Sequence, residues 1–259
     1  MGVRINTNLE ALNAQRNLSA TAVSFSKSVE KLSSGLRINR AADDAAGLGI
    51  SETFRGQVKG LNQAMRNAQD GISLIQTGEG ALNEVHSMLQ RIRELAVQYN
   101  NGTNDTNAQD SIKAEADALQ TTIAAIGTNT KFNGVSLLSA AATVTLQVGA
   151  NAGETQDVAL TALDTSAADV TDLSTIDDVI AAVSTQRAAF GAAQNALEHT
   201  VNSISVAAEN FTASESRIRD LDVASEMVSF TKSQILQQAG TAILAQANQA
   251  PQTILSLLK

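Results

Sequence analysis

Cysteine is absent from this chain of 259 residues, histidine occurs only twice, and proline occurs once. Without cysteine the protein has no disulfide bond, no thiolate nucleophile and no cysteine-ligated metal centre. A single proline allows long uninterrupted helices, because proline is the residue that most strongly disrupts a helix interior. These absences argue against several classes of enzyme and favour long helices.

Aromatic residues are also scarce, at 3% of the chain, although hydrophobic residues make up 43% of it. Each buried aromatic ring removes a large area from water, so an ordinary globular core of this size uses more of them. The apolar content consists mostly of Ala, Leu, Ile and Val. These residues suit narrow seams between helices better than one thick core.

The formal net charge is −8, and the charges are unevenly placed. Residues 1–66 hold nine Lys and Arg against five Asp and Glu, whereas residues 132–186 hold seven acidic and no basic residues. A phosphate-binding surface needs clustered cations, so the acidic stretch is not a nucleic-acid surface. We interpret it as a solvated outer face.

The first fifteen residues lack the apolar run and the small-residue cleavage site of a secretory signal peptide. No segment has the roughly 20 consecutive apolar residues that span a membrane. We therefore expect no cleavable signal peptide and no membrane contact.

Apolar residues advance by alternating steps of three and four residues in several segments. This spacing places them on one face of a helix, and over many turns it is typical of coiled-coil packing. The series run from Leu18 to Leu36, from Phe54 to Leu89, from Ile112 to Ile126, from Ile176 to Phe211, and from Leu236 to Leu257.

Only the middle of the chain, near residues 130–162, shows strand signals. Asn133 and Gly134 form a turn dipeptide, and Val144, Leu146 and Val148 alternate with polar residues. The sequence thus predicts a mainly α fold: a long, coiled-coil-like helical hairpin rod with a small β-hairpin region at the middle of the chain.

The titratable residues form no catalytic pattern. The two histidines do not form the HExxH motif of zinc proteases. His86 shares a helix face with Glu79. We interpret His86 as a histidine in the helix seam that is hydrogen-bonded to a carboxylate or to the backbone. In each adjacent acidic pair, 43–44 and 177–178, the two side chains point apart on a helix. We expect the second pair to interact with the partial positive charge at the N-terminus of a helix. We predict that the protein is not an enzyme and holds no cofactor or metal.

Seven blocks of the sequence resemble bacterial flagellins, in the order found in that family, and they are distributed over nearly the whole length of the chain. The blocks are INTNLEALNAQRNL (5–18), LSSGLRINRAADDAAGLGISE (32–52), QDGISLIQTGEGALNEVHSMLQRIRELAVQ (69–98), FNGVSLL (132–138), LQVGANAGET (146–155), SRIRDLDVASEM (216–227) and QILQQAGTAILAQANQAPQTILSLL (234–258).

The resemblance implies an inner tube domain from residues 1–44 and 220–259 and a rod domain from residues 45–219, with β-hairpins near 130–162. The outer domains that larger flagellins insert are missing here. It implies a structural subunit that self-assembles into the extracellular helical filament used for swimming. A hook–filament junction protein is the alternative within the class.

Apolar residues of the predicted stripes are candidates for two kinds of contact. The tube-domain assembly seam comprises Ile5, Leu9, Leu12, Leu18, Phe25, Val29, Leu32, Leu236, Ile243, Ala247, Ile254 and Leu257. The rod-domain core comprises Phe54, Val58, Leu61, Ile72, Ile75, Leu82, Leu89, Phe190, Leu197, Val201, Ile204 and Phe211. The terminal helices have few partners within one chain, so we expect them to fold on assembly.

The resemblance implies further partners: the type III export apparatus, cap and hook-associated proteins, and an export chaperone. The chaperone contacts would be Ile235, Leu236, Ile243, Leu244, Ile254 and Leu255. A Toll-like innate immune receptor is implied at Arg91, Leu95 and Glu115. From the residues alone, Arg91 is equally a solubilising charge and Leu95 equally a packing residue between protomers.

Two other classes of protein stay open at this point. Heptads alone also fit a cytosolic coiled-coil adaptor, which would remain a small oligomer. An enzyme would require a metal activity bound to a filament, for which the sequence offers no ligand cluster.

Overall fold

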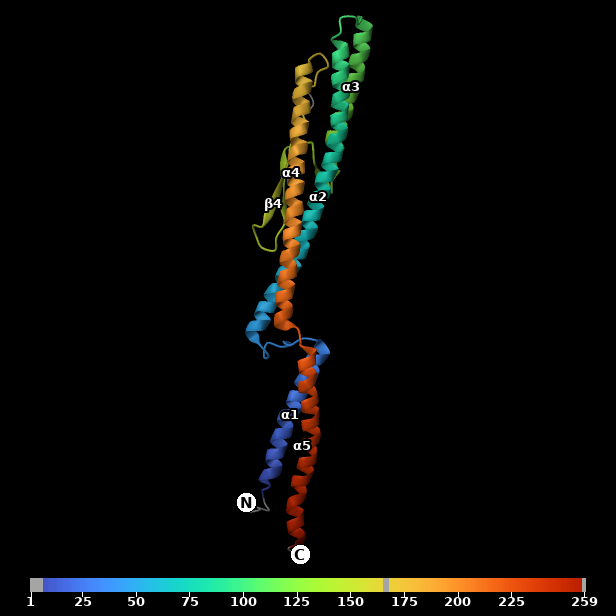
Figure 1. Ribbon diagram of the computed structural model, residues 1–259. Coiled ribbons are helices and arrows are strands. Elements are labelled where there is room, and N and C mark those ends of the chain that lie inside the picture. Colours follow the sequence, from blue (N-terminus) through green and yellow to red (C-terminus); the bar gives the residue numbers. More distant parts are fainter. Residues whose placement is uncertain (1–6, 165–167, 258–259) are drawn as a thin grey trace. The chain divides into compact units, whose positions relative to one another are not determined.

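The computed structural model describes residues 7–164 and 168–257, with side chains up to residue 249 (Figure 1). Its elements confirm the predicted mainly α class, and within the described residues short strands occur only at the middle of the chain. They are α1 (Leu9–Ser34), α2 (Ala45–Tyr99), α3 (Thr106–Asn129), β1 (Lys131–Phe132), β2 (Val135–Ser136), β3 (Ala142–Gln147), β4 (Thr155–Leu160), α4 (Leu173–Arg219) and α5 (Val223–Leu257).

The chain divides into two compact units. The first, here called the terminal unit, joins Met1–Arg55 to Phe211–Lys259, and the second, the central unit, is Gly56–Asn210. The predicted domain boundaries coincide with helix ends. The division seen in the structure instead assigns the first turns of α2 and the last turns of α4 to the terminal unit.

Helices α1 and α5 lie side by side in the terminal unit (Figure 1). Asn8 caps the start of α1, because its Oδ1 accepts the N–H of Ala11 at 3.0 Å. Its Nδ2 separately donates to the carbonyl of Ala247 on α5 at 2.7 Å. Gly35 ends the helix in the left-handed conformation, with φ of 71°. The caps thus account for both ends of α1, and the Asn8 cap also ties it to α5.

The two segments that connect helices in the terminal unit are hydrogen-bonded to each other. Leu36 and Asp220 form an antiparallel bridge, in which Arg37 N–H donates to the carbonyl of Arg219 at 2.7 Å. The Arg37 guanidinium also donates to the carbonyl of Ile218, and so caps the last turn of α4. The connection after α1 and the connection before α5 are therefore held together.

The central unit has an extensive core between α2, α3, α4 and the hairpins. Asp44 and Asp105 cap the starts of α2 and α3, each accepting a backbone N–H at 2.8 Å. Large side chains from every helix of the unit are fully buried, among them Ile75, Leu82, Leu89, Ile123, Phe190 and Leu197.

Both hairpins lie in the region predicted to contain strands. Asn133 and Gly134 have φ of 47° and 82° in the tight turn between β1 and β2, as the turn dipeptide predicts. Strands β3 and β4 pair antiparallel, with Val144 opposite Val158. Val158 is buried on the side of this hairpin that packs against the core.

Glycines on α2 create the space that the hairpin and α4 occupy. A Cβ at Gly71 would collide with the side chain of Leu146 on β3, and a Cβ at Gly78 would lie 2.8 Å from the ring of Phe190 on α4. Both glycines are buried, whereas Gly80 faces open space. Close approach, rather than flexibility, is therefore what Gly71 and Gly78 provide.

We predict opposite effects for the same substitution at Gly78 and Gly80. Gly78→Ala should lower the free energy of unfolding by about 1–3 kcal/mol, because the new methyl group overpacks against Phe190. Gly80→Ala should raise it by about 0.5–1 kcal/mol through helix propensity. Urea unfolding followed by circular dichroism measures both, and stabilisation by both substitutions would contradict the packing described here.

Candidate functional site

Helix α1 contacts α5 through a narrow face. The rings of Phe25 and Phe230 stack with centroids 5.0 Å apart, and the side chain of Leu18 lies against Gly240. Leu32 is half-buried on α1, and the residue buried most deeply on this helix is a serine, Ser28. The contact between the two helices therefore contains small and polar groups among its few large apolar ones.

Several predicted seam residues of α1 lie outside this contact. Leu9, Leu12 and Val29 are exposed, and Ser28 occupies the inward position that the predicted stripe gave to Val29. The actual stripe is shifted by one residue at that turn. Within a single chain, a large part of the apolar surface of α1 therefore has no partner.

Helix α5 shows an inverted pattern of polarity. The positions that share the face toward α1 are Phe230, Ser233, Gln237, Gly240, Leu244 and Ala247, spaced by three and four residues, and four of them are small or polar. Exposed fractions are instead high for large apolar residues: Val228 71%, Ile235 59%, Leu236 48% and Ile243 59%. An ordinary surface helix places such residues inward and its polar residues outward. The outer face of α5 thus has the composition expected of an interface.

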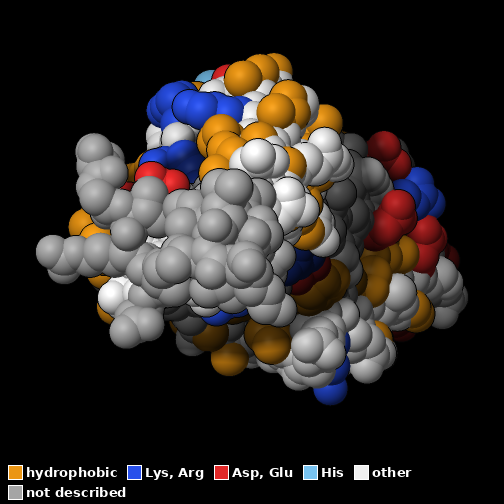
Figure 2. All heavy atoms as spheres, turned by 90° about the horizontal axis from the view of Figure 1, so that it is seen from below, with side chains coloured by type: hydrophobic (Ala, Val, Ile, Leu, Met, Phe, Trp, Pro, Cys, Tyr) orange, Lys and Arg blue, Asp and Glu red, His pale blue; other side chains and the backbone are white. Residues whose placement is uncertain are grey.

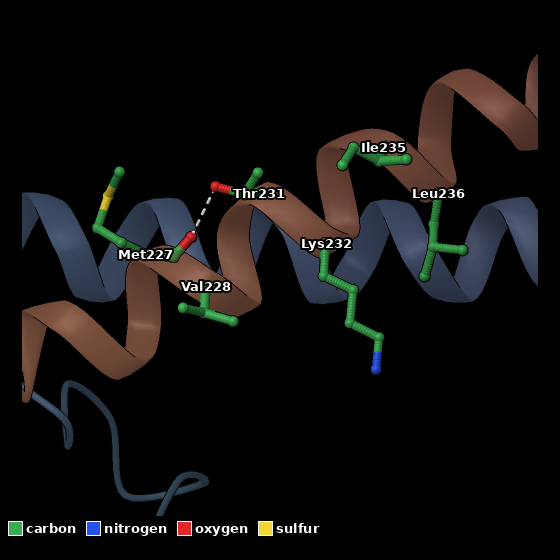
Figure 3. Close-up of a pocket in the computed structure, with 6 residues that line it drawn as sticks. All are labelled: Met227, Val228, Thr231, Lys232, Ile235 and Leu236. Atoms are coloured by element: carbon green, nitrogen blue, oxygen red, sulfur yellow. Dashed lines mark hydrogen bonds between the residues drawn. The ribbon is translucent and has the colours of Figure 1, made fainter.

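An open groove of about 540 Å³ lies on this outer face (Figure 3). It is lined by Met227, Val228, Thr231, Lys232, Ile235 and Leu236. The Thr231 hydroxyl donates to the carbonyl of Met227 at 2.8 Å, so its proton is already used. From Ser233 to Leu257 the helix carries no charged residue. Water-exposed helices normally carry charges, and their absence favours burial against a partner.

Hydrophobic side chains also lie in groups on the face of the molecule shown in Figure 2, beside Lys and Arg side chains. Exposed large apolar residues are concentrated in the terminal unit. They include Leu9, Leu12, Val23, Val29, Ile50, Val223, Met227, Val228, Ile235, Leu236 and Ile243.

Four predicted contact residues fall outside the part of the chain whose side chains are described: Ile5, Ile254, Leu255 and Leu257. Of the other predicted chaperone contacts, Ile235, Leu236 and Ile243 are exposed and Leu244 is half-buried. Ala247, predicted for the seam, is buried next to the Asn8 cap.

Most predicted rod-core residues lie in the core of the central unit. Leu61, Ile75, Leu82, Leu89, Phe190, Leu197 and Ile204 are buried, and Val58, Ile72 and Val201 are half-buried. Phe54 and Phe211 belong instead to the terminal unit, where their rings lie 5.5 Å apart. The single stripe missed Leu74, Val85, Ile92 and Leu95 on α2, because this helix is covered from two sides.

The candidate receptor residues do not form one exposed patch. Arg91 donates to Glu115 at 2.8 Å and to Glu94 at 3.1 Å, and its hydrogen bond with the Glu115 carboxylate is the main cause that raises the pKa of Arg91. Leu95, however, is 1% exposed. The prediction of Leu95 as a receptor contact is therefore corrected, since its side chain packs in the core and only Arg91 and Glu115 are accessible.

The titratable groups have structural partners, although not all those predicted. Glu79 pairs with Arg187 at 3.7 Å, and His86 contacts the amide of Gln90 at 3.0 Å, which corrects the expected carboxylate or backbone bond. Asp177, expected to balance helix charge, bonds to Arg93 at 2.7 Å. The cap at the start of α4 is Asp172, which accepts the N–H of Ser174. The Ser174 hydroxyl also donates to this carboxylate at 2.7 Å, and the hydroxyl and the N–H of Ser174 together lower the pKa of Asp172.

Within the described residues, no group of three His, Cys, Asp or Glu side chains is placed to hold a metal ion. Among the same residues, no helix combines the length and the apolar character needed to cross a membrane. The distinctive feature of the surface is thus the exposed apolar face of the terminal helices.

Comparison with known proteins identifies a family that has helical regions at both ends of its chains. Residues 5–143 match the model of the bacterial flagellin N-terminal helical region, and residues 173–258 match that of the C-terminal helical region. The chain belongs to the bacterial flagellin family. A flagellin of Halalkalibacterium halodurans is 53% identical over 98% of this chain and 99% of its own length.

Two further relatives extend the comparison. The flagellar filament 33 kDa core protein of Treponema phagedenis is 44% identical over 98% of this chain and 99% of its own. The crystal structure of Bacillus cereus flagellin, at 32% identity and a TM-score of 0.50, covers 54% of this chain and 88% of that one.

The protein is thus a structural subunit of the flagellar filament, and it is not an enzyme. These matches give no support to the hook–filament junction alternative.

Truncation of Leu95 tests its corrected position. Leu95→Ala should lower the free energy of unfolding by about 2–5 kcal/mol, as for other large-to-small changes in a packed core. Arg91→Ala, one turn away on the solvent side, should change it far less, because exposed ion pairs contribute little. Urea unfolding compares the two, and a Leu95→Ala variant as stable as Arg91→Ala would contradict the burial of Leu95.

Proposed function

We propose that copies of this chain assemble into the filament by burying the outer faces of α1 and α5 against one another. In this arrangement the terminal segments, residues 1–44 and 220–259, form the inner tube, and residues 45–219 form the surrounding rod without outer domains. The inverted polarity of α5 is the observation that carries the proposal. A helix whose larger apolar residues face outward gains stability only when another surface covers them.

The distribution of charge supports the same arrangement. The central unit carries seven Lys and Arg against seventeen Asp and Glu, a net charge of −10. The terminal unit carries eleven against nine, a net charge of +2. Net charge on the water-facing part keeps an assembly soluble, whereas a nearly neutral part packs against copies of itself without strong repulsion. An acidic rod around a nearly neutral tube therefore meets both requirements.

The weak contact between α1 and α5 supports folding on assembly. Within α1 and the described side chains of α5, only Ser28 and Ala247 are buried. So little buried surface offsets only a small part of the entropy lost when two long helices become ordered. In this proposal the terminal helices are loosely formed in the free subunit and become stable when neighbours cover them.

The exposed apolar face of α5 also bears on export of the subunit. Ile235, Leu236 and Ile243 belong to both the assembly face and the predicted chaperone contact, so a chaperone that covers them prevents assembly until the chain has left the cell. The chain then leaves through the type III export apparatus, without a cleavable signal peptide, and assembles extracellularly between hook-associated and cap proteins. A receptor contact in the central unit would use the accessible side chains of Arg91 and Glu115.

A charge placed on the outer face of α5 tests the assembly proposal. Ile235→Asp should raise the critical concentration for seeded polymerisation about tenfold or more, because the carboxylate loses its hydration on burial. Val206→Asp serves as the control, since Val206 is equally exposed, at 58%, but lies on α4 in the central unit. Sedimentation and electron microscopy of seeded samples measure both variants. Normal filaments from Ile235→Asp together with failure of Val206→Asp would exclude the proposed face.

Amide hydrogen exchange tests folding on assembly. In the free subunit, exchange should be fast over residues 1–40 and 225–259 and slow in the core of the central unit, because the terminal helices bury so little. The same terminal amides should become protected in filaments. Strong protection of both terminal segments in the free subunit would contradict the coupling of their folding to assembly.

A further inference from the structure

Met227 differs from the other described methionines in its exposure. Its side chain lies on the outer face of α5 and is 45% exposed, whereas Met65 and Met88 are half-buried in the central unit. Met88 packs against the hydrophobic core of that unit. Oxidants in solution reach an exposed thioether faster than a buried one. Met227 is therefore the methionine of the described chain that is most open to oxidation.

The surroundings of Met227 are almost entirely apolar. Val228, Ile235 and Leu236 line the same groove, and the Thr231 hydroxyl is already bonded to the Met227 carbonyl. The Lys232 side chain extends away from the methionine sulfur (Figure 3). The groove thus holds no free hydrogen-bond donor aimed at a polar group on the Met227 sulfur.

We propose that Met227 is a modification site at which hydrogen peroxide switches off assembly. The inference rests on the proposed function, in which a second copy of this chain covers the groove. A lone pair of the Met227 sulfur attacks one peroxide oxygen, so that an S–O bond forms and the O–O bond breaks. The departing hydroxide takes the proton from the oxygen that is now bound to sulfur and leaves as water, and the sulfur is oxidised by two electrons to the sulfoxide.

The sulfoxide changes what the groove can bury. A thioether packs among Val, Ile and Leu side chains without a hydrogen bond, whereas a sulfoxide oxygen is a strong acceptor. Its burial among apolar side chains without a donor is unfavourable. A free subunit oxidised at Met227 therefore adds to a filament poorly. A subunit already in a filament has its groove covered, and its Met227 is protected from the oxidant.

The experiment treats free subunits with hydrogen peroxide, locates the added oxygen by peptide mass spectrometry, and measures elongation of untreated filament seeds. For each variant, the elongation rate after treatment is divided by the rate of the same untreated variant, so differences in basal rate cancel. Wild-type protein should lose about tenfold in this ratio, and a methionine sulfoxide reductase should restore it. Met227→Leu should keep a ratio near one. The double variant Met65→Leu and Met88→Leu should remain as sensitive as wild type.

The proposal would be overturned by unchanged elongation of subunits fully oxidised at Met227, or by a Met227→Leu variant as sensitive as wild type. Oxidation of Met227 at the same rate in filaments as in free subunits would also overturn it, because the groove would then not be covered. That last result would show that the proposed assembly face itself is wrong, whereas either of the first two leaves the face in place and removes only the oxidation switch. The two failures are therefore distinguishable.

Discussion

The contact between α1 and α5 is the constraint on which the rest of the structure depends. It joins the two ends of the chain through one aromatic pair, a leucine against Gly240, and positions such as Ser28, Ser233 and Gln237. Because these small and polar residues occupy part of the inward face, several large apolar side chains of both helices are left facing outward. A contact of this kind aligns two helices but does not stabilise them strongly, and it leaves the surface that a neighbouring subunit can cover.

The central unit, in contrast, buries a core of apolar side chains within a single chain. Its core closes within one chain, because Gly71 and Gly78 let β3 and α4 approach α2 closely and because residues on two sides of α2 are buried. A unit of this kind keeps its shape without neighbours, whereas the terminal unit depends on them. The hydrogen-bonded connections around Arg37 keep the end of α1 paired with the beginning of α5. The pairing of the two long helices can therefore extend from that end when a partner arrives.

The helices, the hairpin region and the family could all be predicted from the sequence, because heptad spacing and turn dipeptides act over a few residues. The residue of each heptad that faces inward could not be predicted in the same way. Val29 continues the apolar heptad series, yet Ser28 is the buried residue at that turn and Val29 is 42% exposed. Gly71 and Gly78 were missed because glycine has no side chain to count as apolar. Leu95 was assigned to a receptor contact by resemblance, but α2 is covered on that side as well.

The same physical property makes the outer face of α5 both functional and vulnerable. A face that must stay apolar for assembly is accessible to every other binding partner and to every oxidant until a second copy covers it. Charged residues would protect such a face in the free subunit, but they would also oppose its burial, and α5 carries none after Lys232. Protection therefore has to come from outside the chain, and in our proposal it comes from a chaperone before export and from neighbouring subunits after it. The scarcity of aromatic residues has the same origin: each subunit supplies one side of many narrow contacts, and Leu, Ile and Ala are sufficient for a contact completed by another chain.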